Sequence, residues 1–213
     1  MTSRASRSGF TLVELMVVVL ILIVVAALAL TIGRRAMQSA RFSGSISRAH
    51  DLGAMVLIHA TDHNGELPVW HDYNQGKYWW QLITGDFSTE GSESELFRSP
   101  NHSEFDPEQV AMTISYGWNY PVIGRHKGDS GFKEDHVLRL ANFDDPGRVL
   151  VLCDGARSNS WGFIDGYANI PDPQRYNGRA AGFILDGSVR TLRTPDEFAP
   201  DSEWFTPVRD LVR

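Results

Sequence analysis

The chain has 213 residues, of which 42% are apolar and 11% aromatic, with 20 basic against 26 acidic side chains. The length leaves room for one or two domains, and the aromatic content excludes a collagen-like or wholly disordered chain. A net charge of −6 disfavours a nucleic-acid binder that works by broad phosphate neutralisation. A single cysteine, Cys153, excludes an internal disulfide framework and multi-cysteine zinc sites.

A basic leader precedes the longest apolar stretch of the sequence. Residues 1–9 carry Arg4 and Arg7 and no acid, and residues 10–32 contain one ionisable side chain, Glu14. Because a helix rises about 1.5 Å per residue, this stretch is long enough to cross a hydrocarbon core of about 30 Å. The pattern predicts a transmembrane helix.

Two interpretations fit a basic leader followed by an apolar stretch. In the first, the segment is a secretory signal peptide, and residues 27–29 (Ala-Leu-Ala) supply a small-x-small site for signal peptidase. In the second, the helix is retained as an anchor. Glu14 favours the anchor, because a carboxylate costs roughly 2.5–3.5 kcal/mol at the bilayer centre and a disposable signal gains nothing from it. Such an acid needs a cationic partner, and residues 10–32 contain none.

Residues 8–15 read Ser-Gly-Phe-Thr-Leu-Val-Glu-Leu. They resemble the cleavage and methylation motif of type IV prepilins and type II secretion pseudopilins. The resemblance implies that prepilin peptidase cuts between Gly9 and Phe10 on the cytoplasmic side and methylates the new amino group of Phe10. Glu14 then becomes the fifth residue of the mature chain.

The spacing of the motif has a physical reason. A free amine at the start of a helix and a carboxylate one turn deeper lie on roughly the same face. The amine of an incoming subunit can therefore neutralise Glu14 of a neighbour, and two buried charges cost less as a pair than alone. Glu14 is expected to set the register of subunit assembly, as a buried polar residue does in a coiled coil. The simpler alternative is a side chain that reaches the headgroups.

The resemblance also implies a location and partners. It implies a single-pass protein of the bacterial inner membrane with its head on the periplasmic side, which later enters a periplasmic or surface filament. The implied partners are copies of itself and other pilin-like subunits, prepilin peptidase, the inner-membrane assembly machinery and membrane lipid, with no nucleic acid. The flanking charges do not fix the orientation, because basic residues stand at both ends of the helix: Arg4, Arg7, Arg34, Arg35 and Arg41.

The expected role is structural, in a helical pseudopilus for type II-type protein secretion. One alternative keeps the fold and changes the task to a minor pilin with an adhesive head. The other is a membrane-anchored periplasmic enzyme or binding protein, which requires a catalytic or binding cluster in the head.

Helical periodicity continues beyond the membrane segment. Apolar residues recur at steps of three and four from Phe42 to Ala60, and Asn64-Gly65 followed by Pro68 predicts a helix end. We expect one helix from residue 10 to about residue 63. Its candidate bends are Gly33, Gly44 and Gly53. The expected regions are the leader 1–9, the transmembrane and assembly helix 10–32, the amphipathic helix 33–64 and the globular head 65–213.

Short apolar runs between turn residues predict the strands of the head. They are residues 112–116, 148–153, 181–185 and 188–192. Asp186-Gly187 between the last two predicts a hairpin with a type I′ turn, in which both central residues have positive φ. Residues 78–82 predict the start of a short second helix. The expected fold class is α+β, a pilin-like ladle in which the long N-terminal helix packs on a small antiparallel sheet.

The head shows a second resemblance. Residues 61–68, 115–119 and 186–189 resemble a large bacterial subgroup of pseudopilin-type proteins that commonly ends in His, nine residues, then Asp-Gly. Here the spacing is kept, but Tyr176 stands where the histidine is expected. Ser99-Pro100 stands where the subgroup often has Cys-Pro. These departures weaken any histidine-dependent role and leave Cys153 without an expected partner.

Two sets of residues could bind metal, and each has a simpler explanation. His59 and His63 have the spacing of zinc ligands on a helix, but Ala60 stands where a His-Glu-x-x-His motif has its general base. Some pseudopilins that this chain resembles carry a structural calcium in a late loop. Aspartates are also ordinary turn residues, and no spacing matches an EF-hand. The late aspartates are Asp144, Asp145, Asp154, Asp165, Asp172 and Asp186.

Two further features could carry chemistry. An apolar run surrounds Cys153 and is expected to raise the pKa of its thiol, which disfavours a catalytic cysteine. Trp79-Trp80 could stack on a sugar, although core packing is the commoner use of such a pair. We therefore expect no catalytic residues, no enzyme activity, no cofactor and no assigned metal site, with a structural calcium left open.

Overall fold

The computed structural model describes residues 11–85, 91–128, 137–157 and 160–205. The α-helices are α1 (Leu12–Asp62), α2 (Trp79–Thr84) and α3 (Val110–Thr113). The strands are β1 (His71–Asp72), β2 (Lys77–Tyr78), β3 (Tyr116–Asn119), β4 (His126–Lys127), β5 (Leu150–Asp154), β6 (Phe163–Ile164), β7 (Arg179–Ile184) and β8 (Val189–Arg193). Four 3₁₀ turns are η1 (Gly91–Phe97), η2 (Leu140–Asn142), η3 (Pro146–Arg148) and η4 (Asp196–Phe198). The chain divides into one unit up to Ala40 and a second unit from Arg41.

Helix α1 confirms the long helix that the periodicity predicts. It runs without a break for 51 residues, through all three glycines that were candidate bends. It ends at the predicted signal, where Asn64 and Gly65 have φ of 55° and 82°. The Gly65 N–H donates to the Ala60 carbonyl at 2.7 Å, which closes the last turn.

In the first unit, every residue of α1 from Leu12 to Ala40 is exposed. The large apolar side chains from Leu12 to Ile32 have exposed fractions between 45% and 74%. By length and composition this helix could cross a membrane. An apolar surface of this extent is covered by lipid or by other protein when the protein is in its working environment.

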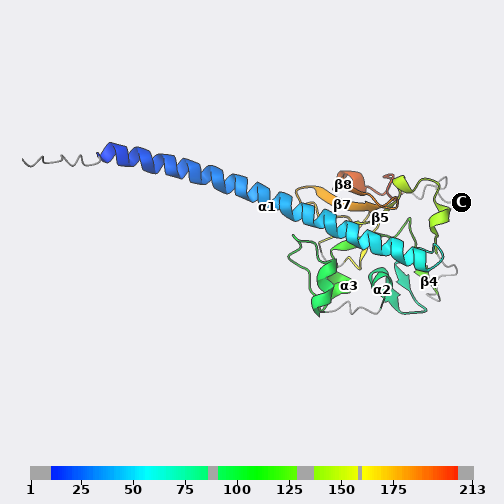
Figure 1. The fold of residues 1–213 in the computed structure, drawn as a ribbon. Helices are drawn as coiled ribbons and strands as arrows, with labels where there is room; N and C mark the ends of the chain where they lie inside the picture. The colour runs from blue at the N-terminus through cyan, green and yellow to red at the C-terminus, as the bar shows by residue number, and fades with distance from the viewer. Residues whose placement is uncertain (1–10, 86–90, 129–136, 158–159, 206–213) are drawn as a thin grey trace, which may run out of the picture. The chain divides into compact units, whose positions relative to one another are not determined.

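In the second unit, one face of α1 packs on the strands of the head (Figure 1). The buried positions repeat at steps of three and four, with one adjacent pair at 52 and 53: Phe42, Ser45, Ala49, Leu52, Gly53, Val56 and Ala60. Gly53 lies where helix and sheet approach most closely, since a Cβ there would stand 2.2 Å from the Phe183 ring of β7. The structure thus gives this glycine a packing role.

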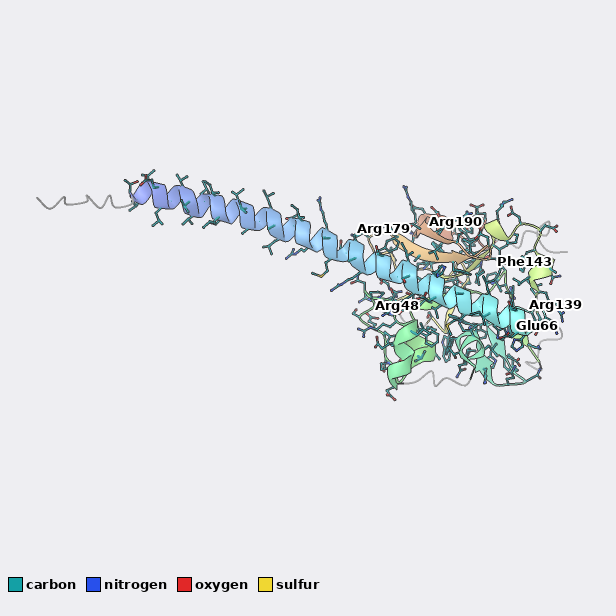
Figure 2. The ribbon with its side chains drawn as sticks, viewed as in Figure 1. Arg48, Glu66, Arg139, Phe143, Arg179 and Arg190 are labelled. Atoms are coloured by element: carbon teal, nitrogen blue, oxygen red, sulfur yellow. The ribbon has the colours of Figure 1, made fainter. Side chains whose placement is uncertain are left out.

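The end of α1 is joined to the rest of the head through Glu66. Its carboxylate forms ion pairs with Lys127 of β4 and with Arg139, whose Nη2 lies 3.8 Å away. Figure 2 shows Glu66 and Arg139 side by side at this end of the helix. Further back on α1, the Arg179 guanidinium lies 4.3 Å from the centroid of the Phe42 ring.

Two small mixed sheets confirm the α+β class, and β3, β5, β7 and β8 pair antiparallel as expected. Each sheet also contains one parallel pair that the sequence did not predict. The larger sheet has the order β6-β3-β5-β7-β8, and β6 runs parallel to β3. The smaller has the order β2-β1-β4, and β1 runs parallel to β4. Both parallel partners are two-residue strands that reach their neighbours through long connections. No tight hairpin therefore imposes an antiparallel direction on them.

The strand expected at residues 112–116 is wrong in its position. Residues up to Thr113 form α3, and the strand begins at Tyr116. The Thr113 hydroxyl accepts the Asp106 N–H at 2.9 Å and can donate to the Gln109 carbonyl at 3.0 Å. These local hydrogen bonds favour a turn of helix over an extended chain. The run at 148–153 is confirmed as β5, which begins two residues later and ends one residue later.

The hairpin at Asp186-Gly187 is confirmed, but its turn type is wrong. Strands β7 and β8 pair antiparallel from Arg179↔Arg193 to Phe183↔Val189. Of the two turn residues only Gly187 has positive φ, 91°. Its N–H donates to the Ile184 carbonyl at 2.9 Å, so the residues between them are the centre of the turn and Gly187 follows it. This is the loop with one left-handed residue after the turn.

Candidate assembly segment and the buried network of the head

Glu14 forms a reciprocal cap with Thr11 at the start of α1. Its Oε2 accepts the Thr11 N–H at 2.8 Å and the Thr11 hydroxyl at 2.9 Å. In return the Glu14 N–H donates to the Thr11 Oγ1 at 3.3 Å. This is a capping box, which satisfies donors that the first turn of a helix leaves free. The Thr-x-x-Glu spacing was visible in the sequence, but this role was not predicted.

Glu14 has no cation near it within α1. The next basic residues along the helix are Arg34 and Arg35, about 30 Å further at 1.5 Å per residue. The cap supplies hydrogen bonds to the carboxylate and no neutralising charge. Gly9 and Phe10, the predicted cleavage and methylation sites, lie outside the described residues.

Residues 4–30 match the model of a protein family described as the prokaryotic N-terminal methylation motif. The matched segment includes Gly9, Phe10, Glu14 and most of the apolar stretch. Together with the long helix and the α+β head, it is consistent with the type IV prepilin-like family and confirms that resemblance for the N-terminal segment. No curated protein and no solved structure gives a significant match to the chain.

A buried polar network lies between α1 and the larger sheet, and its centre is Asp154 of β5. One carboxylate oxygen, Oδ1, accepts the Ser45 hydroxyl of α1 at 2.8 Å, and Oδ2 accepts the Ala181 N–H of β7 at 2.7 Å. The Arg175 guanidinium lies 3.9 Å from Oδ1, and both charged side chains are 2% exposed. Burial raises the pKa of the Asp154 carboxyl, while Arg175 and the hydrogen bonds oppose that shift. The network joins helix, β5 and β7.

Tyr176 and Ser99 extend this network. The Tyr176 hydroxyl lies 2.5 Å from the Ser99 Oγ, which in turn lies 3.4 Å from the Ser45 Oγ. These are the two positions at which the chain departs from the subgroup pattern. The sequence showed them as separate departures, 77 residues apart, and the structure shows that they are neighbours.

His102 is held neutral beside the same network. Its Nε2 lies 2.6 Å from the Arg157 carbonyl, which can only accept, so Nε2 carries the proton. Nδ1 therefore accepts the Ser115 hydroxyl at 2.7 Å. Burial, and then the charge of Arg175, lower the pKa of His102 to about 4. His102 is 4% and Ser115 0% exposed, so the pair stabilises the fold and no substrate can reach it.

The residues that could bind metal make local contacts in the described structure. The rings of His59 and His63 stack at 4.0 Å between centroids, and each Nδ1 lies near a backbone carbonyl. The carboxylates of Asp165, Asp172 and Asp186 each accept a backbone N–H of their own turn. Within the described ranges, no group of three or more His, Cys, Asp or Glu side chains is placed to hold a metal ion.

The remaining candidates lie in the core. Cys153 is fully buried in β5, and burial raises the pKa of its thiol, as the apolar run predicted. Trp79 and Trp80 of α2 are 0% and 2% exposed, and the Trp79 Nε1–H donates to the Gly162 carbonyl at 2.7 Å. This tryptophan pair therefore packs the core and cannot serve as a sugar-stacking surface.

Proposed function

We propose that the chain is the precursor of a structural pilin-like subunit. It is cut between Gly9 and Phe10, methylated at the Phe10 amine and assembled into a helical pseudopilus for type II-type protein secretion. The observation that carries the proposal is the methylation motif at residues 4–30 on a helix whose exposed apolar surface contains one acid, Glu14.

Assembly follows from the physical properties of α1. Apolar helices that associate with an axial offset make head-to-tail contacts that do not close, and such contacts build filaments. Glu14 adds specificity, because its carboxylate is tolerable in an apolar surrounding only beside a cation. The new N-terminal ammonium of an incoming subunit supplies that cation. The cap from Thr11 holds the carboxylate at the amino end of the helix, where such an ammonium arrives.

Processing gives the proposal its orientation. The leader, residues 1–9, lies on the cytoplasmic side, where the membrane-embedded peptidase removes it, and the head lies in the periplasm. Cleavage removes Arg4 and Arg7 and creates the charge that Glu14 needs. The partners of the mature subunit are then its own copies, other pilin-like subunits, the inner-membrane assembly machinery and lipid.

Mass spectrometry of the mature N-terminus tests the processing step. We expect a chain that begins with N-methylated Phe10, and a chain that begins at Leu30 would show instead that the segment is a signal peptide. Gly9→Ala should leave unprocessed precursor in the membrane. Gly33→Ala is the matched control, because no atom lies within 4 Å of a Cβ at that position.

Substitution of the acid tests the assembly step. Glu14→Gln keeps the shape and a hydrogen-bond acceptor but removes the charge, so we expect normal cleavage and loss of the subunit from sheared filaments. Asp51→Asn, an exposed acid further along α1, is the control. Filaments of Glu14→Gln in wild-type yield would contradict the pairing of Glu14 with an ammonium.

Comparison of secreted proteins tests the secretion role. Loss of the gene should reduce the release of one or more exported proteins, and wild-type but not Glu14→Gln protein should restore it. An unchanged set of secreted proteins together with loss of surface attachment would favour the adhesive alternative.

A further inference from the structure

The head contains an open cleft that assembly through α1 does not use. It has a volume of about 400 Å³. Its lining residues are Tyr120, Pro121, Arg125, Asp165, Tyr167, Pro200 and Phe205. A second hollow of about 150 Å³ shares Tyr120, Pro121 and Arg125 with it, so the two adjoin along these residues. The larger volume lies in the range of sites for small molecules, roughly 300–1,000 Å³.

One wall of the cleft is an exposed aromatic ring on an ordered loop. Tyr167 is 77% exposed. The Asp165 Oδ1 accepts the N–H of Tyr167 at 2.9 Å and that of Asn169 at 3.0 Å. Gly166 has φ of 77° and packs so closely on Phe205 that a Cβ would stand 2.8 Å from its ring. The loop therefore presents the Tyr167 ring to solvent in a defined place, as a surface for stacking.

A second aromatic ring in the cleft, that of Tyr120, packs against two other aromatic rings. Its centroid lies 5.4 Å from that of Trp70 and 5.0 Å from that of Phe163. The Arg125 guanidinium lies 5.0 Å from the Tyr120 centroid, which holds this exposed cation along the cleft. Rings and cation are thus positioned before any ligand arrives, which lowers the cost of binding.

The charges of the cleft indicate the class of ligand. Arg125 offers N–H donors and Asp165 offers carboxylate acceptors, one cation against one anion. A sugar ring carries hydroxyl groups that both donate and accept, and it has an apolar C–H face that packs on an aromatic ring. A nucleic acid or phosphate would meet a carboxylate beside the cation, on a chain with net charge −6.

We propose that this cleft binds a neutral oligosaccharide, with one sugar ring against Tyr167 and hydroxyl groups held by Arg125 and Asp165. Such a site gives the head a task of its own, the capture of a glycan. It does not depend on how the N-terminus is processed.

Ligand titration of the full-length chain tests the site. The chain is purified in a zwitterionic detergent, because maltoside detergents carry a sugar headgroup. Maltohexaose, cellohexaose and chitohexaose are then added at millimolar concentration, with saturation-transfer NMR and calorimetry as readouts. We expect at least one hexasaccharide to bind. Tyr167→Ala should weaken that binding roughly three- to tenfold, and Tyr167→Phe should retain it.

Charge variants supply the matched control. Arg125→Ala should weaken the same interaction, whereas Arg98→Ala, which removes a partly exposed arginine outside the cleft, should not. Tryptophan fluorescence checks that each variant is folded. The proposal is overturned if none of the three hexasaccharides binds, if Tyr167→Ala and Arg125→Ala bind as wild type, or if oligothymidylate binds in preference to every sugar.

Discussion

Glu14 and Asp154 are two acids in apolar surroundings, and they differ in where their cation comes from. Asp154 is enclosed by the head, and Arg175 of the same chain lies 3.9 Å away, with hydrogen bonds from Ser45 and Ala181 around it. Glu14 stands on an exposed apolar helix, where, among the residues that the structure describes, the cap of Thr11 is its hydrogen-bond partner. The charge of Asp154 is compensated within the folded head, whereas we propose that the cation for Glu14 comes from another subunit.

The comparison separates folding from assembly. An acid whose partner is internal adds to the cooperativity of one domain, and its removal harms that domain. Removal of an acid whose partner lies on another molecule leaves the stability of its own domain unchanged and weakens the complex. All six tryptophans of the chain lie in the head, so tryptophan fluorescence of the detergent-solubilised protein reports on the head by itself. This readout distinguishes the two kinds of acid.

Removal of Asp154 should have the largest effect. Asp154→Ala leaves the Arg175 charge buried without compensation, which typically costs about 3–5 kcal/mol of the free energy of unfolding. Urea unfolding measures the loss, and Asp51→Ala, at an exposed acid, is the control. If the alanine variant does not fold, Asp154→Asn should fold with a smaller loss. A change below about 1 kcal/mol in both would contradict a structural role for the pair.

Acid should weaken the head through His102. The folded state lowers the pKa of His102 from 6.5 to about 4, so the unfolded chain binds more protons between these values. The free energy of unfolding therefore falls as the pH drops from 6.5 towards 4, by about 3 kcal/mol for this group. His102→Gln should flatten the difference between unfolding curves measured at pH 6.5 and at pH 4. If the free energy of unfolding falls by the same amount between pH 6.5 and pH 4 in wild type and in His102→Gln, the stabilising role of neutral His102 is refuted.

Crowding at the helix–sheet contact should have an intermediate effect. Gly53→Ala places a methyl group against the Phe183 ring and should cost about 1–3 kcal/mol. Gly33→Ala, in the open part of α1, should leave the unfolding of the head unchanged. Thermal unfolding of the two variants compares them directly, and an equal shift in both would show that the contact at Gly53 adapts freely.

The smallest effect on the head should come from Glu14. Glu14→Gln should change the free energy of unfolding of the head by less than about 0.5 kcal/mol, because Glu14 is exposed and forms its hydrogen bonds with Thr11 in the first unit. The same variant should be lost from filaments. A large destabilisation of the head by Glu14→Gln would contradict the conclusion that Asp154, and not Glu14, stabilises the head.

Much of the fold was predictable because it depends on local patterns. Hydrophobic periodicity predicted α1 as far as its end at Asn64-Gly65, and Asp186-Gly187 predicted the hairpin between β7 and β8. The strand at residues 112–116 was misplaced, since hydrogen bonds of Thr113 favour a helical turn there. The parallel pairing of β4 with β1 and of β6 with β3 was also missed, because short strands reached through long loops leave little trace in the sequence.

The candidate sites divide in the same way. The methylation motif and its acid are contiguous, so residues 8–15 are enough to indicate them. The contact of Tyr176 with Ser99 joins positions far apart in the chain, so no contiguous motif could indicate it. Tyr120 and Tyr167 of the cleft are likewise isolated in the sequence, and their only signal is an aromatic residue beside a turn.

The amino-acid sequence by itself determined the membrane-length helix, its single acid and the likeness to prepilin-type precursors, because each depends on residues adjacent in the chain or repeated at a helical period. Only the tertiary structure decided how the head uses its polar residues. It buried Asp154 with Arg175, held His102 neutral and left Tyr167 exposed in a cleft that Arg125 and Asp165 also line. The reason is that burial and charge pairing depend on which distant segments meet, and packing of the whole chain determines that.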